Sequence, residues 1–318
     1  MIAALLLLMS QVTEPADAAQ PQIVVLVGAG GESQYETAFA ESAAAWERLQ
    51  DARLAAVDVR RGDDVRRDAV RERLGALVGD PPPSLWLVLI GHGTFDGETA
   101  KFNVPGPDLT AGDLREPLDR IDCPQVVINT TSASAPFLNA LSRPGRVIVT
   151  ATKAGTEQNL TRFGREWAAI LVEALPEQEP ARWDLVDLDK DRAVSLLELA
   201  VAATGRTAAT YDDEGRLATE HSLLDDNGDA LGTRLDRFDG TQVAASDDDA
   251  APLDGRVAGR VLLVQEGTRL TSEQLARRAE LEAELERLKA RRPDPIDDRY
   301  LDELEAILVP LSRLGTGR

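Results

Sequence analysis

The chain has 318 residues, a formal net charge of −20 and an isoelectric point near 4.6. Its hydrophobic content of 43% and charged content of 28% are typical of a soluble globular protein with one large core or two ordinary ones. A chain this acidic repels phosphate backbones, which argues against nucleic acid as a partner. Cations, basic peptides or solubility alone explain the charge better.

The N-terminus has the pattern of a signal peptide. The apolar run Ile2–Met9 is too short to span a bilayer, and Ala16-Asp17-Ala18 supplies the small residues of a cleavage site. We therefore predict a signal peptide over residues 1–18 and export to the bacterial periplasm or the extracellular space. No Lys or Arg precedes the apolar run, so a form tethered to the membrane by an uncleaved leader is the alternative.

Cysteine and histidine are rare in this chain. Cys123 is the only cysteine, which excludes an intrachain disulfide and a cysteine-rich zinc site. The two histidines, His92 and His221, leave little for a transition-metal site. We therefore expect that no metal or cofactor is required.

Short apolar runs alternate with helical patterns up to residue 175. Strands are predicted over residues 22–28, 53–59, 84–91, 124–129 and 145–152. Helices are predicted over residues 36–49, 63–78, 110–120 and 160–175. This alternation predicts an α/β fold of three layers, a mainly parallel sheet with helices on both faces.

The third predicted strand ends at a histidine. His92 follows it directly and is flanked by Gly91 and Gly93. In parallel sheets, catalytic and ligand-binding groups gather beyond the carboxyl ends of the strands. The position favours a functional role for His92 about as much as a purely structural one.

The fourth predicted strand ends in a loop rich in hydroxyl groups. Its members are Thr130, Thr131, Ser132 and Ser134. A hydroxyl group beside a histidine suggests a nucleophile and its base. Serine and threonine are also ordinary residues at a helix N-terminus, so the loop alone does not establish catalysis.

Together these strand ends resemble the legumain–caspase superfamily of cysteine peptidases, in particular bacterial relatives of the legumain branch. The family's His-Gly pair matches His92-Gly93, and its Cys-x-Ser-Gly pattern matches residues 132–135. Its Ala-Ser or Ala-Thr turn after the next strand, which shapes the substrate pocket, matches Ala151-Thr152. The resemblance covers about residues 22–240 and implies a caspase-like fold.

The nucleophile departs from the family pattern. Ser132, or Thr131 if the alignment shifts by one residue, replaces the family's cysteine. Cys123 cannot substitute for it, because the intervening strand separates it from His92 by about 20 Å at 3.3 Å per residue. A serine hydroxyl is a far weaker acid than a thiol and needs a well-oriented base.

We therefore favour a catalytically degenerate peptidase homologue that acts as a binding or scaffold module for a peptide or protein ligand. The alternative is an active hydrolase or peptidase that uses Ser132 with His92, with Gly93, Ala151 and Thr152 in the substrate pocket. Asp96 is close to His92 in sequence and is a candidate to orient its ring.

A third reading is a calcium-responsive assembly protein. Residues 187–198 have the spacing of an EF-hand loop. The candidate ligands are Asp187, Asp189, Asp191, Ala193, Ser195 and Glu198. Arg192 stands where such loops have glycine, which leaves an Asp-rich structural loop as an equal alternative. Residues 225–236 repeat the spacing more weakly, and a turn is the better interpretation there.

The rest of the chain reads as an appendage to this domain. We assign residues 19–240 to the caspase-like domain, 241–259 to a linker and 260–318 to a C-terminal helical hairpin. A strand-like run over residues 260–264 is expected to dock on the domain. The hairpin's apolar face is expected to pack in cis, with self-association as the alternative.

Overall fold

The computed structural model describes residues 20–175, 185–243, 254–265, 272–293 and 295–315. They belong to two compact units, one spanning Gln20–Glu266 and the other containing the two C-terminal helices. The predicted signal peptide and residues 244–253 of the predicted linker lie outside the described residues. None of the described helices has the length and apolar character needed to cross a membrane.

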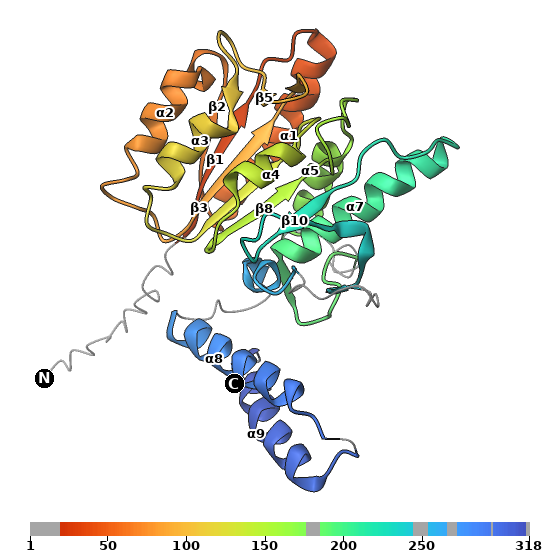
Figure 1. The fold of residues 1–318 in the computed structure, drawn as a ribbon. Helices are drawn as coiled ribbons and strands as arrows, with labels where there is room; N and C mark the ends of the chain where they lie inside the picture. The colour runs from red at the N-terminus through yellow and green to blue at the C-terminus, as the bar shows by residue number, and fades with distance from the viewer. Residues whose placement is uncertain (1–19, 176–184, 244–253, 266–271, 294, 316–318) are drawn as a thin grey trace, which may run out of the picture. The chain divides into compact units, whose positions relative to one another are not determined.

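A mainly parallel sheet organises the larger unit (Figure 1). Five parallel strands run in the order β2-β1-β3-β7-β8. They are β1 (Gln22–Val27), β2 (Ala56–Arg60), β3 (Leu85–Ile90), β7 (Gln125–Asn129) and β8 (Arg146–Thr150). All five predicted strands are thereby confirmed.

Two short antiparallel strands extend the sheet beyond β8, and the sequence did not predict them. They are β10 (Leu223–Asp225) and β11 (Thr233–Arg234). With three and two residues, they are too short to show an alternation of apolar and polar residues.

Helices cover both faces of the sheet, as the sequence predicted. One face carries α1 (Ser33–Asp51), α5 (Phe163–Glu173) and α7 (Leu196–Asp213). The other carries α2 (Arg67–Gly75), α3 (Ala111–Leu118) and α4 (Ala135–Leu141). Side chains alternate between the two cores, so that in β1 Ile23 and Val25 face α1 while Val24 and Leu26 face the opposite side. The three-layer α/β architecture is confirmed.

Local sequence signals set several boundaries. The spacing of Thr110 and Asp113 predicts a capping box, and these residues form it at the start of α3. Ser195 and Glu198 form a second capping box, at the start of α7. The charged segment predicted as a helix over residues 63–78 divides into a 3₁₀ turn, Gly62–Val65, and the shorter α2.

The larger unit also contains short strands outside the main sheet. A three-stranded antiparallel sheet follows β3 and consists of β4 (Gly93–Phe95), β5 (Ala100–Phe102) and β6 (Leu109–Thr110). The run expected to dock on the domain contains β14 (Leu262–Gln265), which pairs with β9 (Ala193–Ser195). This docking is confirmed. The remaining short elements are β12 (Phe238–Asp239), β13 (Gln242–Val243) and 3₁₀ turns at Leu235–Arg237 and Ala258–Arg260.

The second unit is a helical hairpin of α8 (Ser272–Ala290) and α9 (Asp298–Gly315). Its small core contains Leu281, Leu288, Tyr300 and Ile307. The leucine spacing in α9 predicts a packed face of Leu301, Leu304, Leu308 and Leu311, but Leu301 and Leu308 are exposed. Tyr300 and Ile307 set the phase of α9 instead, which turns their C-terminal neighbours outward.

Candidate functional site

The site predicted from the sequence lies at the carboxyl ends of β3 and β7. These strands are parallel neighbours, with Leu89 opposite Asn129. The Thr130 N–H and hydroxyl both donate to the Leu89 carbonyl, at 3.1 and 2.8 Å, which holds the two exits together. The loops after both strands therefore lie at one edge of the sheet.

The His92 side chain is directed toward α1. Its Nε2–H donates to the Gly30 carbonyl at 3.2 Å. The ring makes edge contacts with Tyr35 and Phe39, whose centroids lie 4.9 and 5.1 Å away. Because a carbonyl oxygen only accepts, Nε2 carries the proton and Nδ1 alone keeps a lone pair in the neutral ring.

The hydroxyl groups of the two candidate nucleophiles, Ser132 and Thr131, donate to other partners than His92. Ser132 Oγ donates to the Gly93 carbonyl at 3.1 Å, and the residue is 5% exposed. Thr131 Oγ1 donates to Asn129 Oδ1 at 2.8 Å and is fully buried. In the described part of the chain, no hydrogen bond joins either hydroxyl to His92.

Gly93 is the point where the two loops touch. A Cβ at this position would lie 2.0 Å from the Ser132 carbonyl oxygen and 2.6 Å from Thr131 Oγ1. No side chain fits in that space. The structure therefore places Gly93 as a packing contact between the β3 and β7 exits.

The predicted pocket residues are also buried. Ala151 and Thr152 are both 0% exposed. Thr152 Oγ1 accepts from the Ser134 N–H at 2.8 Å, and the Thr152 N–H donates to Ser134 Oγ at 3.1 Å. These bonds tie the turn after β8 to the start of α4.

Asp96 does not orient His92. Its carboxylate accepts from Lys101 Nζ at 2.8 Å and from the Thr99 and Glu98 N–H groups, at 2.8 and 3.1 Å. Lys101 and these backbone donors hold the pKa of Asp96 well below its usual range. The histidine with a carboxylate partner is His221, whose Nδ1 lies 2.5 Å from Glu157 Oε1.

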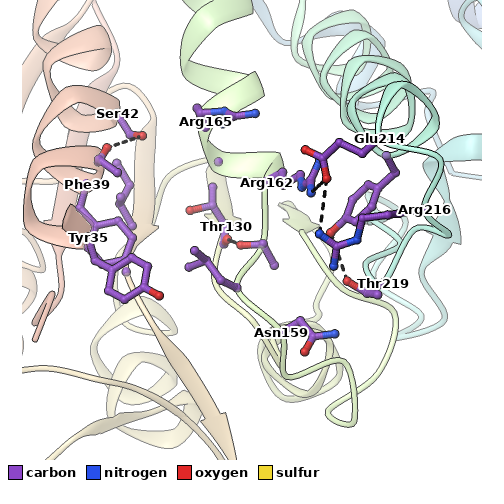
Figure 2. A pocket seen from close by; sticks show the side chains of 17 residues that line it. Tyr35, Phe39, Ser42, Thr130, Asn159, Arg162, Arg165, Glu214, Arg216 and Thr219 are labelled. Atoms are coloured by element: carbon purple, nitrogen blue, oxygen red, sulfur yellow. Dashed lines mark hydrogen bonds and ion pairs between the residues drawn. The ribbon is translucent and has the colours of Figure 1, made fainter. Parts of the chain in front are cut away.

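A cavity of about 500 Å³ lies between α1 and α5, and Tyr35 and Phe39, whose rings contact His92, line it. Figure 2 shows Tyr35, Phe39 and Ser42 on one side and a group of arginines on the other, with Thr130 between them. The arginines are Arg162, Arg165 and Arg216. The sequence analysis did not single out these residues, because they come from α1, the start of α5 and the segment after α7.

The arginine side of the cavity is held by Glu214, Tyr211 and Glu220. Arg162 donates to Glu214 Oε2 at 2.6 Å and to the Thr210 carbonyl at 3.0 Å, and its guanidinium lies 4.1 Å from the Tyr211 ring centroid. Arg162 lowers the pKa of Glu214. Glu220 accepts from the Arg162 and Phe163 N–H groups, and burial raises its pKa.

The Asp-rich loop brings three of its six predicted ligands together. Oxygens of Asp187, Asp189 and Asp191 lie within 4.8 Å of one another, close enough to share one cation. Glu198 is outside this group. It accepts from the Leu188 N–H at 2.7 Å and from Ser195 N and Oγ, both at 2.8 Å, and burial raises its pKa.

No family model matches the sequence, and no curated protein matches it. The chain is similar to caspases in fold. It is similar to the Drosophila initiator caspase Dronc, with 11% identity, a TM-score of 0.42, and coverage of 68% of this chain and 81% of Dronc.

A second solved structure, caspase-1 from Spodoptera frugiperda, gives a comparable match. The identity is 8% and the TM-score 0.44, over 66% of this chain and 87% of that caspase.

Proposed function

We propose that this chain is a peptidase-related protein of the legumain branch that binds a ligand without cleaving it. The supporting observation is that the candidate nucleophile and the candidate base donate hydrogen bonds to different partners. Ser132 Oγ donates to Gly93, and His92 Nε2 donates to Gly30. A serine becomes a nucleophile only when an adjacent base takes its proton, and here that contact is missing.

Cys123, the one cysteine of the chain, does not supply the nucleophile. Cys123 precedes β7, whereas His92 follows the opposite end of the neighbouring strand β3. Burial also raises the pKa of Cys123, which keeps the thiol protonated and weakly nucleophilic. Among the described residues, the hydrogen bonds of Ser132 and His92 go to the Gly93 and Gly30 carbonyls and not to each other.

A fluorophosphonate probe, which reacts with activated serines, tests the proposal. We expect no labelling of the parent protein and no hydrolysis of fluorogenic peptides. The Ser132→Ala variant should behave identically, and its stability should fall by only about 1 kcal/mol, the typical value of one hydrogen bond.

The alternative, an active hydrolase using Ser132 with His92, makes the opposite prediction. Labelling of the parent that is abolished in both Ser132→Ala and His92→Ala would establish it. The Ser132→Cys variant sharpens the test, because a thiolate forms more easily than an alkoxide. Activity in that variant alone would show that only the nucleophile was lost.

A second function, calcium binding, is favoured by the three carboxylates of the Asp-rich loop. Asp187, Asp189 and Asp191 would hold the ion, and the ion would offset their mutual repulsion. We expect millimolar calcium to raise the melting temperature, because a ligand that binds the native state stabilises it, by about 2.7 kcal/mol at 100 times Kd.

Substitutions test whether the calcium effect comes from this loop or from the rest of the acidic surface. Asp189→Asn should abolish the calcium effect while keeping the hydrogen bond that Asp189 Oδ1 accepts from the Asp191 N–H. Asp229→Asn, in the second Asp-rich loop, is the matched control and should leave the effect unchanged. A parent protein whose melting temperature does not respond to millimolar calcium would end this proposal.

A further inference from the structure

The cavity between α1 and α5 has two chemically different walls. Tyr35 and Phe39 of α1 form an apolar, aromatic wall, and Leu160 adds to the apolar lining. Arg162, Arg165 and Arg216 line the other side. Its volume of about 500 Å³ is in the range of small-molecule sites, which is roughly 300–1,000 Å³.

Two of the arginines have N–H groups that are available to a ligand. A guanidinium carries five N–H groups. Arg216 makes one long bond, from Nη1 to Glu214 at 3.4 Å, and Arg165 uses Nε and Nη2 on Glu166, at 2.9 and 2.7 Å. Within the described residues, Nη2 of Arg216 and Nη1 of Arg165 have no hydrogen-bond partner in the protein.

The local charge opposes that of the whole chain. The charged residues that line the cavity are these three arginines and one carboxylate, Glu214. The chain as a whole carries −20. A cationic patch on so acidic a surface selects for a ligand of small negative charge, because a larger anionic body is repelled by its surroundings.

We infer that this cavity binds a small organic acid, with its carboxylate on Arg165 and Arg216 and its apolar body against Tyr35 and Phe39. A guanidinium fork matches the geometry of a carboxylate, and the aromatic wall gains from burying a flat apolar group. The excess of arginine over carboxylate in the lining favours an acid over a neutral ligand of the same shape. The inference rests on the proposed role in binding, and it requires no catalysis.

Calorimetric titration with a matched pair of compounds tests it. Indole-3-propionate has the charge and the flat apolar body, whereas indole-3-propionamide has the same shape without the charge. We expect the acid to bind at least tenfold more tightly than the amide. We also expect salt to weaken only the acid, because screening acts on the charge contact.

Variants locate the site. Arg165→Gln and Arg216→Gln should each weaken the acid by about tenfold and leave the amide unchanged. Both side chains are more than half exposed, at 66% and 61%, so folding should tolerate the changes. Arg61→Gln is the matched control, since it removes the same charge from an exposed ion pair with Glu47 away from the cavity.

Three results would overturn the inference: equal affinity for acid and amide, no binding of either compound at millimolar concentration, or equal weakening by Arg61→Gln. Failure of the proposed function is separate, because it is detected by fluorophosphonate labelling and peptide hydrolysis. A protein that labels with the probe and still binds the acid through Arg216 would refute the proposed function and support the inference about the cavity.

Discussion

The two Asp-rich loops, residues 187–198 and 225–236, have the same backbone design. Each has positive φ angles at its fourth and sixth positions, 62° and 67° at Lys190 and Arg192, and 79° and 63° at Gly228 and Ala230. In each, the sixth N–H donates to the first aspartate, Asp187 or Asp225, at 3.1 and 3.2 Å. The same spacing of aspartates in the sequence thus gives the same loop conformation at both places in the chain.

The two loops are closed by different carboxylates. Glu198, eleven residues after Asp187, closes the first loop from the adjoining helix α7. The second loop is closed by Asp254, which accepts from the Asp226 N–H at 3.0 Å and from Thr233 N and Oγ1, at 3.1 and 2.7 Å. The first loop is therefore a local structure, and the second is a junction between distant segments.

The second loop also packs against the turn before β8. The Ala230 N–H donates to Ser142 Oγ at 2.9 Å, and Asn139 Nδ2 donates to the Ala230 carbonyl at 2.9 Å. A Cβ on Gly228 would lie 2.5 Å from the backbone of Arg143. These contacts join the second loop to α4 and to the turn that follows it.

The largest expected effect is a difference in stability between the first aspartates of the two loops. Asp225 is 0% exposed and accepts from the Gly228 and Ala230 N–H groups, so Asp225→Ala removes two hydrogen bonds to a buried carboxylate and should cost about 3 kcal/mol. Asp187→Ala should cost about half as much, because Asp189 and Asp191 are exposed and water reaches that loop. Urea denaturation measures both values.

Exposed Asp239→Ala is the control for the loss of one negative charge and should be nearly neutral. Equal losses for Asp187→Ala and Asp225→Ala would show that the two loops do not differ in the way described.

The next effect is a pH dependence of stability that arises from Asp254, which closes the second loop. Burial raises the pKa of Asp254 from 3.8 to about 6, and the neighbouring Asp226 adds to this. The folded state therefore holds a proton between about pH 4 and pH 6 that the unfolded state has lost. Through this group the stability should fall as the pH rises across that window, on the order of 2 kcal/mol.

Asp254→Asn removes this titration and tests its sign. The free energy of unfolding of the parent, measured relative to that of the variant, should decrease from pH 4 to pH 6. A difference that stays constant, or that increases with pH, would contradict the assignment.

The smallest effect concerns the strained sixth positions. Arg192→Gly and Ala230→Gly should each be neutral or stabilise by up to about 1 kcal/mol, because glycine adopts positive φ without the cost that a Cβ imposes. Arg192→Gly should also strengthen calcium binding, since it removes a cation beside three carboxylates. Thermal melts with and without calcium distinguish the two contributions, and only the first loop should show the second one.

Local sequence signals made much of the fold predictable. The strand runs, the capping box at Thr110 and the packing of helices on both faces depend on residues close together in the chain. The strands β4, β5, β6, β10 and β11 were missed, because each has only two or three residues. The phase of α9 was partly wrong, since it depends on which residues meet α8 rather than on α9 alone.

The candidate site was less predictable than the fold. The sequence placed His92 and Ser132 at one edge of the sheet, because parallel strands end together. It could not say where their side chains point. That was decided by the Gly30 carbonyl, the Tyr35 and Phe39 rings and the Gly93 carbonyl, which come from other segments and take up the available hydrogen bonds.

The amino-acid sequence by itself determined the parallel α/β sheet, the helix caps and the conformation of both Asp-rich loops, because these follow from periodicity and from hydrogen bonds over a few residues. Only the tertiary structure decided that Ser132 and His92 have separate partners and that three arginines line a cavity with two aromatic rings of α1. The reason is physical. A side chain's direction and charge environment are set by groups that lie far away in the chain and become neighbours only when the sheet and its helices pack together.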